Sequence, residues 1–519
     1  MEINTNVDYL KSVRCADVYT ESSTDYVLPD YLGDVRKILF TEATLRPSGR
    51  FAGGDEVEFS GIVVYNVIYL NSEGGLCSVD FTSDYDYSVK CSGENYNDSI
   101  ADTRVSNYAV RLIGPRKINA KASLVGSVHL CERESLCVSG DAFTGQHEPE
   151  INRGTANVRV SKTSSVTERE YAESVAKLDG AIADEVSVIH SFIDVMVEDV
   201  HREESTVCVK GKIRMCAVIK NNDEPAYCTE KTIPYEENID FESIMPDMTL
   251  IPQMSVTSLR TEVNAEETGC NVVMSAIVEM CVIGEGNQPV SLVLDGYLKE
   301  MPTDNCYESF EFATLTDAVT VRESHSAEIS RSEIDSDQLR EIVFLTSTPK
   351  VESVEPYEGG VAVTGEVRYS GIASEFSGNA ISYTGIKFST PFTINVNLSC
   401  QNNEKTQIDV ELHTQNASAS LDDEKLYVSC SLVCTAVATT EGCQEVLSSM
   451  SCTEGECYES DCAKITVYYP NSEDTLFSVA KRFRTSSLKV ANDNDITEAV
   501  FAQDNPTGSL AGVKKLVIF

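Results

Sequence analysis

The sequence predicts a mainly β protein, built from three tandem β-sandwich or barrel-like domains and one small strand–helix–helix–strand module. Three observations predict it. Short segments alternate apolar and polar residues with the period of two that marks half-buried strands. One of these segments recurs three times along the chain of 519 residues. Amphipathic helical periodicity is scarce and is clearest near the carboxyl end.

The recurring segment is centred on a glycine. VEFSGIVVY at 57–65, VCVKGKIRM at 207–215 and VAVTGEVRY at 361–369 align without gaps when Gly61, Gly211 and Gly365 are placed in register. The spacings are 211 − 61 = 150 and 365 − 211 = 154 residues. Positions two and four residues from each glycine are apolar, so we expect a strand whose buried face includes the glycine. The missing side chain would permit a bend, a bulge or the close approach of a second sheet.

Each copy continues into a second strand-rich half, at 117–131, 270–284 and 425–438. The tripeptides DAF at 141–143 and DGY at 295–297 recur at the same spacing. A unit of about 150 residues is the size of a complete β-sandwich or barrel domain. We therefore expect domains at 1–140, 141–294 and 295–460, followed by a module at 461–519.

Three segments are expected to differ from this strand pattern. Residues 92–107 are polar and rich in turn formers, so they should connect the two halves of the first unit. Residues 165–181 fit one helix, and residues 332–344 fit the beginning of another.

The net charge is −41, and it is unevenly distributed. Residues 463–519 carry seven Lys and Arg against six Asp and Glu, a net of +1, so the first 462 residues carry −42. Such an acidic body repels nucleic-acid phosphates and anionic lipid, so neither is expected as a partner. No run of 18 apolar residues exists, and MEINTNVDYLKSVRC does not fit a secretion signal. Membrane insertion is therefore not expected, and the expected location is cytoplasmic.

No catalytic constellation, cofactor or metal site is expected. None of the six histidines belongs to an H-E-x-x-H motif or is expected to lie within a carboxylate cluster, and no G-x-S-x-G or P-loop is present. The acidic run at 80–87 fits a solvated face better than a Ca²⁺ site. The 18 cysteines include no C-x-x-C pair. Most should be small, reduced, buried residues, with Cys452, Cys457 and Cys462 as candidates for later cross-linking.

The carboxyl module begins with an alternating strand at 465–469 and ends with the strand KKLVIF at 514–519. Asp474 can cap a first helix that begins at Thr475. The apolar face of that helix comprises Leu476, Val479, Ala480 and Phe483. A second helix follows Ser486 or Ser487. The order of elements and the segment DTLFSVAKRF resemble a LysM domain.

LysM domains usually bind N-acetylglucosamine polymers through two loops. The resemblance places these roles on Asp474, Thr475 and Leu476, and on Asn492 with the residues just after it. Glu473 stands where the family has a glycine, and its side chain would obstruct a sugar. The segment from 492 to 512 is also longer than in the family.

The first helix offers a second kind of site. Lys481, Arg482 and Arg484 lie away from its apolar face, so they are expected to be exposed and to meet a protein partner.

The combination of acidic β repeats with one carboxyl-terminal LysM domain resembles the SPOCS-domain proteins of spore-forming clostridia. IGPRKINAKASLVG at 113–126 also looks like the second half of a SPOCS domain. The resemblance implies a non-enzymatic scaffold in the mother-cell cytosol, at the forespore surface, whose LysM domain docks the ATPase that builds the basal layer of the spore coat. The alternative is a protein that binds peptidoglycan at the cortex or cell wall. Self-association also stays open.

Overall fold

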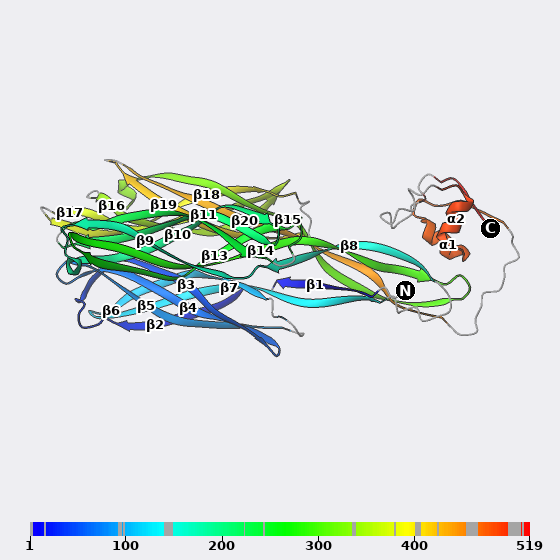
Figure 1. The fold of residues 1–519 in the computed structure, drawn as a ribbon, viewed down its shortest axis with the longest axis horizontal. Coiled ribbons are helices and arrows are strands. Elements are labelled where there is room, and N and C mark those ends of the chain that lie inside the picture. Colours follow the sequence, from blue (N-terminus) through cyan, green and yellow to red (C-terminus); the bar gives the residue numbers. More distant parts are fainter. Residues whose placement is uncertain are drawn as a thin grey trace.

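The computed structural model describes residues 4–14, 17–91, 96, 99–139, 149–222, 224–241, 244–334, 339–377, 380–399, 406–422, 425–452, 465–496, 510 and 513–519. The described chain is mostly antiparallel β-strand, with two short α-helices near its carboxyl end (Figure 1). The predicted mainly β class is confirmed. Among the described helices, neither is long and apolar enough to cross a membrane.

The first structural unit has seven strands in two sheets. One sheet has the order β3–β4–β5, and in the other β7 pairs with β1, β2 and β6. The bounds are β1 Asn4–Arg14, β2 Val18–Val27, β3 Val35–Gly53, β4 Glu56–Asn71, β5 Leu76–Lys90, β6 Ile100–Gly114 and β7 Lys117–Ser139.

The second unit repeats this pairing strand for strand. Its sheets are β10–β11–β12 and a sheet in which β14 pairs with β8, β9 and β13. The bounds are β8 Glu150–Thr163, β9 Thr167–Asp179, β10 Val186–Glu203, β11 Thr206–Asn221, β12 Tyr227–Asp240, β13 Thr249–Glu266 and β14 Gly269–Tyr297, with a 3-10 turn at Ala183–Glu185.

In the third unit one long strand takes the place of the first two. β15 pairs with β20 along nearly its whole length, and β19 pairs with the other edge of β20. The second sheet is β16–β17–β18. The bounds are β15 Thr303–Ser330, β16 Leu339–Tyr357, β17 Gly360–Ser377, β18 Ala380–Asn397, β19 Thr406–Leu421 and β20 Lys425–Cys452, with a 3-10 turn at Arg331–Ile334.

The three glycines predicted to be equivalent lie on equivalent strands. Gly61, Gly211 and Gly365 occupy β4, β11 and β17, the middle strand of each three-stranded sheet. In all three units the register against the preceding strand shifts right beside the glycine, which is the mark of a β-bulge. The prediction of equivalent positions is therefore confirmed, and the bulge is one of the consequences expected from the missing side chain.

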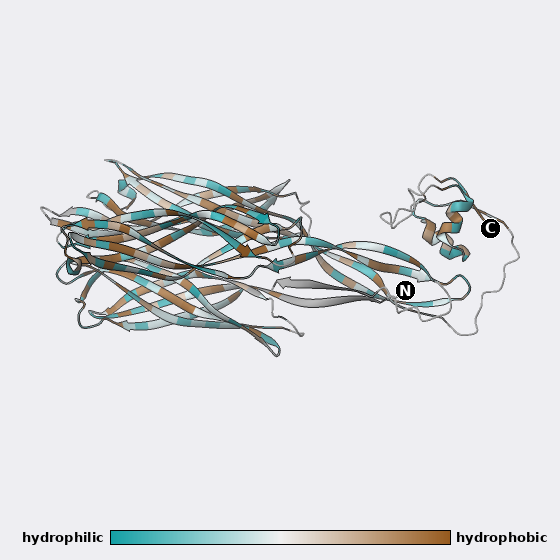
Figure 2. Cartoon of the chain, viewed as in Figure 1, coloured by the Kyte–Doolittle hydropathy of each residue, from teal (hydrophilic) through white to brown (hydrophobic). Residues whose placement is uncertain are grey.

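Each unit encloses its own apolar core between its two sheets, because inward and outward residues alternate along the strands. Val57, Val207 and Val361, which head the three aligned segments, are completely buried. Figure 2 shows hydrophobic residues spread along the strands of the body in alternation with polar ones. The architecture is thus three sandwiches in series.

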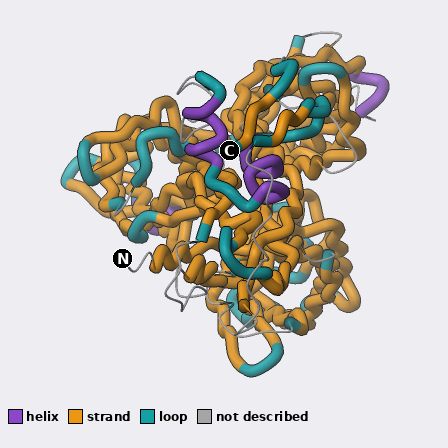
Figure 3. The backbone as a smooth tube through the Cα atoms, turned by 90° about the vertical axis from the view of Figure 1, so that its right-hand side faces the viewer, coloured by secondary structure: helices purple, strands orange, loops and turns teal. Residues whose placement is uncertain are grey.

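A fourth apolar cluster joins the three sandwiches to one another. It takes equivalent residues from each unit, namely Leu39, Ile189 and Val343; Ile68, Val218 and Ile372; and Phe40 and Phe344. At the position equivalent to these two phenylalanines the second unit has the buried His190. The rings of Phe40, His190 and Phe344 meet pairwise with centroids 5.0–5.4 Å apart. Seen along the long axis, the body has three lobes around a centre (Figure 3). The units are therefore arranged about an approximate threefold axis.

The first and last strands of each unit extend beyond the sandwich as paired ribbons. β1 pairs with the end of β7, β8 with the end of β14, and the beginning of β15 with the end of β20. A small apolar cluster from the second and third ribbons includes Val158, Leu292 and Phe310. In Figure 1 these ribbons form a narrow stalk that leads toward the two helices.

Two expectations for local structure are wrong, and a third holds for one turn. Residues 167–179 form strand β9 where a helix was expected, because pairing along β14 buries Val175 and outweighs local helix propensity. Residues 100–107, expected as a connection, begin strand β6. The segment at 332–344 begins within a single 3-10 turn and is strand from Leu339 onward.

The expected boundary between the second and third domains, at residues 294 and 295, falls inside strand β14.

Candidate interaction site

The carboxyl module is built from two short strands and two helices. β21 (Thr466–Tyr468) pairs antiparallel with β22 (Leu516–Ile518), and α1 (Leu476–Phe483) and α2 (Ser487–Asp493) lie between them in sequence. The module has its own core, formed by Leu476, Val479, Ala480, Val490, Ala491, Leu510, Leu516 and Ile518 together with Tyr297 of the body. The predicted order of strand, helix, helix and strand is what the structure shows.

The three residues predicted for the first binding loop are used to build the module. The Asp474 carboxylate accepts hydrogen bonds from the Tyr468 hydroxyl at 2.7 Å and from the Asn471 backbone N–H at 2.8 Å. These two bonds lower the pKa of Asp474 below its usual value. Thr475 is the N-cap of α1 and forms a reciprocal capping box with Ser478. Leu476 is buried in the core.

The second predicted loop is only partly described. Asn492 is exposed near the end of α2, and residues 497–509 and 511–512 lie outside the described residues. Asn494, two residues further on, falls in the segment predicted to contact sugar, but its structural role was not foreseen. Its side chain donates to the carbonyls of Val490 and Val517 at 2.7 and 2.8 Å and accepts from the Val517 N–H at 2.6 Å. It therefore ties α2 to β22.

Arg482 and Arg484 are exposed, as expected, whereas Lys481 is partly buried and paired within the chain, which corrects the expectation that it is free to meet a partner. The Lys481 ammonium lies 2.5 and 2.7 Å from the two carboxylate oxygens of Asp295 in the body. The Arg482 guanidinium lies over the Tyr468 ring and donates to its hydroxyl at 2.5 Å. Arg484 is exposed but ends the helix in a left-handed conformation, with φ of 58°.

The DGY tripeptide at 295–297 is the body's contact with the module. A register shift between Val293 and Asp295 marks a bulge at this end of β14. Asp295 also accepts hydrogen bonds from the Tyr307 hydroxyl at 2.8 Å and the Asn305 amide at 3.1 Å. The Tyr297 hydroxyl donates to the Thr485 carbonyl at 2.6 Å. Its ring packs edge-on against Phe477, with centroids 5.3 Å apart, and burial raises the pKa of the phenol.

An apolar strip on the strands of the module faces outward. Ile465, Val467 and Tyr469 are 60, 52 and 69 % exposed, and Phe519, which follows β22, is 56 % exposed. Residues two apart on a strand share a face, so these three side chains form one strip. Lys514 and Lys515 are exposed just before β22, so basic charge borders the strip. The strip is the part of the described module with the character of a protein contact.

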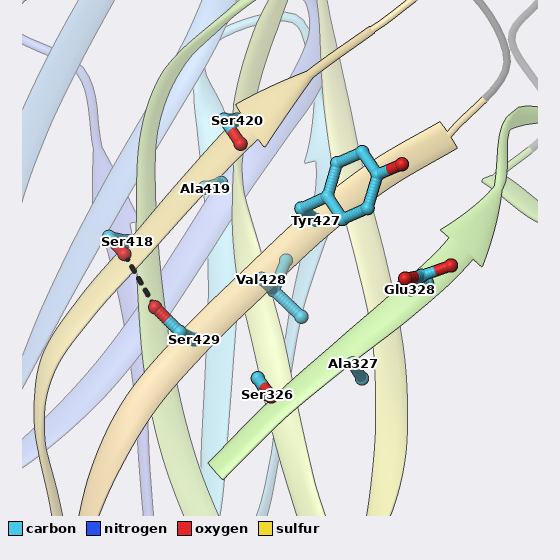
Figure 4. Close-up of a pocket in the computed structure, with 9 residues that line it drawn as sticks. All are labelled: Ser326, Ala327, Glu328, Ser418, Ala419, Ser420, Tyr427, Val428 and Ser429. Carbon is cyan, nitrogen blue, oxygen red and sulfur yellow. Dashed lines mark hydrogen bonds between the residues drawn. The ribbon is translucent and has the colours of Figure 1, made fainter. Parts of the chain in front are cut away.

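A shallow hollow of about 420 Å³ lies over β15, β20 and β19 of the third unit. Serines from the three strands line it, and Ser418 and Ser429 are hydrogen bonded at 2.8 Å (Figure 4). Its acidic residue, Glu328, is paired with Lys425 at 2.6 Å. The hollow therefore offers hydroxyl groups without an unpaired charge.

The cysteines described by the structure are Cys77, Cys91, Cys208, Cys216, Cys228, Cys270, Cys281, Cys306, Cys430, Cys434 and Cys443, and all eleven are free thiols. Cys457 and Cys462, together with the side chain of Cys452, lie outside the described residues. The tripeptide at 141–143 also lies outside them.

Comparisons with known proteins returned nothing: no family model, curated protein or solved structure matches this chain.

Proposed function

We propose that the chain is a non-enzymatic scaffold of the SPOCS-domain type, acting in the mother cell at the forespore surface. Its three sandwiches serve as the body. Its carboxyl module, a LysM-type fold, docks the ATPase that builds the basal layer of the spore coat. The observation that carries the proposal is the outward apolar strip of Ile465, Val467 and Tyr469, on a module whose predicted first-loop residues are engaged within the module.

Engagement of those loop residues also weighs against the peptidoglycan alternative. A sugar bound at the first loop would compete with bonds that already satisfy Asp474 and cap α1. The strip needs no such rearrangement. Protein contacts draw their affinity from a small hydrophobic centre, and a basic rim tunes association rate and salt dependence.

The test uses the full chain with Val467→Asp and Tyr469→Asp combined. Both side chains are more than half exposed, so the variant should fold. We expect it to lose recovery of the basal-layer ATPase and localisation to the forespore. The matched control is Leu488→Asp, which places the same charge at a 60 % exposed position on α2 and should recover the partner normally.

A glycan-binding measurement distinguishes the scaffold function from the peptidoglycan-binding one. The wild-type chain, titrated with N-acetylglucosamine oligomers up to millimolar concentration, should show no saturable binding. Micromolar glycan binding, together with normal partner recovery by the Val467→Asp, Tyr469→Asp variant, would replace the scaffold proposal with the peptidoglycan one.

A further inference from the structure

Three kinds of metal-ligating side chain converge at one end of the β10–β11 hairpin. His201 on β10 and Cys208 on β11 are direct register partners, so their side chains project from the same face. Glu203 is two residues after His201 and lies on that face too. One ligand atom from each of the three lies within 4.8 Å of the others.

A carboxylate orients the imidazole. His201 Nδ1 lies 2.7 Å from Asp199 Oδ2, and Nε2 lies 3.3 Å from Glu203 Oε1. When Nδ1 donates to Asp199, the neutral ring presents the lone pair of Nε2 toward Glu203. A lone pair facing a carboxylate is unfavourable unless a cation lies between them. A carboxylate behind a metal-bound histidine is a common supporting arrangement in metal sites.

The thiol adds a soft donor and has another carboxylate beside it. Cys208 Sγ lies 3.8 Å from Glu236 Oε1 on β12, and Lys210 pairs with the same oxygen of Glu236 at 2.9 Å. Ligand atoms about 2.0–2.3 Å from a tetrahedral Zn²⁺ are separated by about 3.3–3.8 Å. The 3.3 Å between His201 Nε2 and Glu203 Oε1 matches this separation, and the Cys208 thiol lies within 4.8 Å of the ligand atoms of both residues. The 3.8 Å from Cys208 to Glu236 fits Glu236 as a fourth ligand.

The repeated fold provides an internal comparison. The register pair equivalent to His201 and Cys208 is Phe51 and Glu58 in the first unit, and Glu355 and Ala362 in the third. The same hairpin therefore forms without a histidine or a thiol at this place. The cluster is a property of the second unit and is not required by the fold.

We propose that His201, Glu203 and Cys208 bind a divalent transition-metal ion of the Zn²⁺ class. Binding deprotonates the thiol and releases its proton to solvent, and the fourth position is filled by water or by Glu236. Nitrogen, sulfur and carboxylate donors together select Zn²⁺ over Mg²⁺ or Ca²⁺, which prefer oxygen alone. The expectation that no histidine lies within a carboxylate cluster is wrong for His201, because Asp199 and Glu203, two residues before and after it on β10, share its face and contact its ring.

The rival interpretation is a doubly protonated His201 that bridges Asp199 and Glu203 as an imidazolium, with the thiol as a bystander. It predicts no metal affinity above that of the chain's other cysteines. Variants drawn from the equivalent positions of the other units separate the two interpretations while preserving the hairpin.

The experiment uses the full-length reduced chain, stripped of metal, in four forms: wild type, His201→Phe with Cys208→Ala, Cys443→Ala, and Asp199→Asn. Zn²⁺ is titrated in competition with a chromophoric chelator, and Co²⁺ is added separately to follow thiolate-to-metal charge transfer. Cys443→Ala removes an exposed cysteine elsewhere and is the matched control.

Wild type and Cys443→Ala should bind one tight equivalent more than the double variant. The double variant should lack the corresponding Co²⁺ charge-transfer intensity and the Zn²⁺-dependent rise in melting temperature. Asp199→Asn should retain the site with affinity weaker by about 10–100-fold. Glu203→Gln, at an exposed position, provides the same readout if the double variant fails to fold. Equal stoichiometry and equal melting shifts in wild type, the His201→Phe, Cys208→Ala variant and Glu203→Gln would overturn the proposal.

Discussion

The phenol ring of Tyr235 fills the space that a side chain on Gly211 would need. The two residues are register partners on β12 and β11, and a Cβ on Gly211 would lie 2.7 Å from the Tyr235 hydroxyl oxygen and 1.9 Å from the Met196 carbonyl oxygen. The other units repeat the relationship, with Tyr85 opposite Gly61 and Phe392 opposite Gly365. An aromatic ring laid over a glycine in a sheet compensates for the packing that the glycine lacks.

Gly211→Ala should therefore be strongly destabilising. The new methyl group meets backbone as well as the ring, so the strand must shift, and we expect a loss of about 2–3 kcal/mol in the free energy of unfolding. Chemical denaturation followed by circular dichroism measures it. Gly114→Ala is the control, because its nearest neighbouring atom would be 3.8 Å away and its cost should stay within about 0.5 kcal/mol. Equal costs for the two variants would contradict the close packing at Gly211.

His190, whose ring lies at the threefold axis, and the partly buried Glu42 beside it should offset each other's effect on stability as pH changes. Burial lowers the pKa of His190 to about 4 and raises that of Glu42 to about 7, and His190 Nε2 lies 3.9 Å from the Glu42 carboxylate. Asp80 and Asp194 add repulsion that also raises the Glu42 pKa. Between about pH 4 and 6.5, His190 is protonated in the unfolded chain but neutral in the folded one, so its contribution to stability rises with pH. Between about pH 4.5 and 7, Glu42 is protonated in the folded chain but ionised in the unfolded one, so its contribution falls with pH. The two effects cancel over most of that range.

Replacing either residue should reveal the pH dependence of the free energy of unfolding that the other residue contributes. Glu42→Gln removes the Glu42 contribution, so stability relative to wild type should fall as pH drops from about 7 toward 4.5, by up to about 3 kcal/mol. His190→Phe removes the His190 contribution, so stability relative to wild type should fall as pH rises from about 4 to 6.5, by a similar amount. Phenylalanine is the residue of the other two units at this place. Denaturation series at several pH values check both slopes, and parallel curves for all three proteins would refute the pairing.

Tyr297→Ala should loosen the module from the stalk. The substitution removes the hydrogen bond to the Thr485 carbonyl and the ring contact with Phe477, and it leaves a cavity in the module's core. Truncations of this kind cost about 3–5 kcal/mol when the ring is fully buried. Hydrogen exchange of the α1 amides should accelerate, with those of β4 unchanged. Tyr427→Ala, at a partly exposed position in β20, should leave α1 protected.

Asp295→Asn and Lys481→Met provide a narrower test of the same contact. The pair is partly exposed, so a double-mutant cycle should give a coupling of only about 0.5–1 kcal/mol in module stability. That coupling should shrink as salt concentration rises. A coupling near zero at low salt would mean that Tyr297 alone holds the module.

Thr475→Ala should destabilise the module by about 1 kcal/mol, because it removes the N-cap of α1 and half of the capping box. Thermal unfolding of the α1 region measures the effect. Ser472→Ala, at an exposed position just before the helix, is the control. If the two variants melt alike, Thr475 is free for another role.

The sequence was sufficient to find the strands around Gly61, Gly211 and Gly365, because each buries one face and so alternates with period two. The aligned spacing also makes Phe40, His190 and Phe344 equivalent. It could not show that they meet, because alternation specifies which face is buried and not which unit covers it. Residues 165–181 were misjudged for a related reason: pairing with β14, about a hundred residues away, decides their conformation.

At the candidate site too, features set by residues near in sequence were predictable, and contacts between residues far apart in sequence were not. Local patterns identified the apolar face of α1, since it depends on residues three and four apart. The expected cap was one residue off, because Thr475 and not Asp474 is the N-cap. The partner of Lys481 could not be foreseen, because Asp295 is 186 residues away in the chain. The DGY tripeptide was visible as a repeat marker, but its contact with the module depends on a bulge and on the path of the stalk. At His201, the neighbouring carboxylates Asp199 and Glu203 were visible in the sequence, and only the approach of Cys208 depended on the register of the hairpin.

Because the three sandwiches belong to one chain, the contact among them at the central axis does not depend on protein concentration. In a trimer of separate chains, dilution would dissolve the contact among the three rings, and any ionisable residue there would occur in triplicate. In a tethered arrangement the neighbours meet at an effective concentration on the order of millimolar, however few molecules a cell contains. Each copy is then free to diverge, so a single histidine can stand among phenylalanines at a junction that three identical subunits could only fill alike.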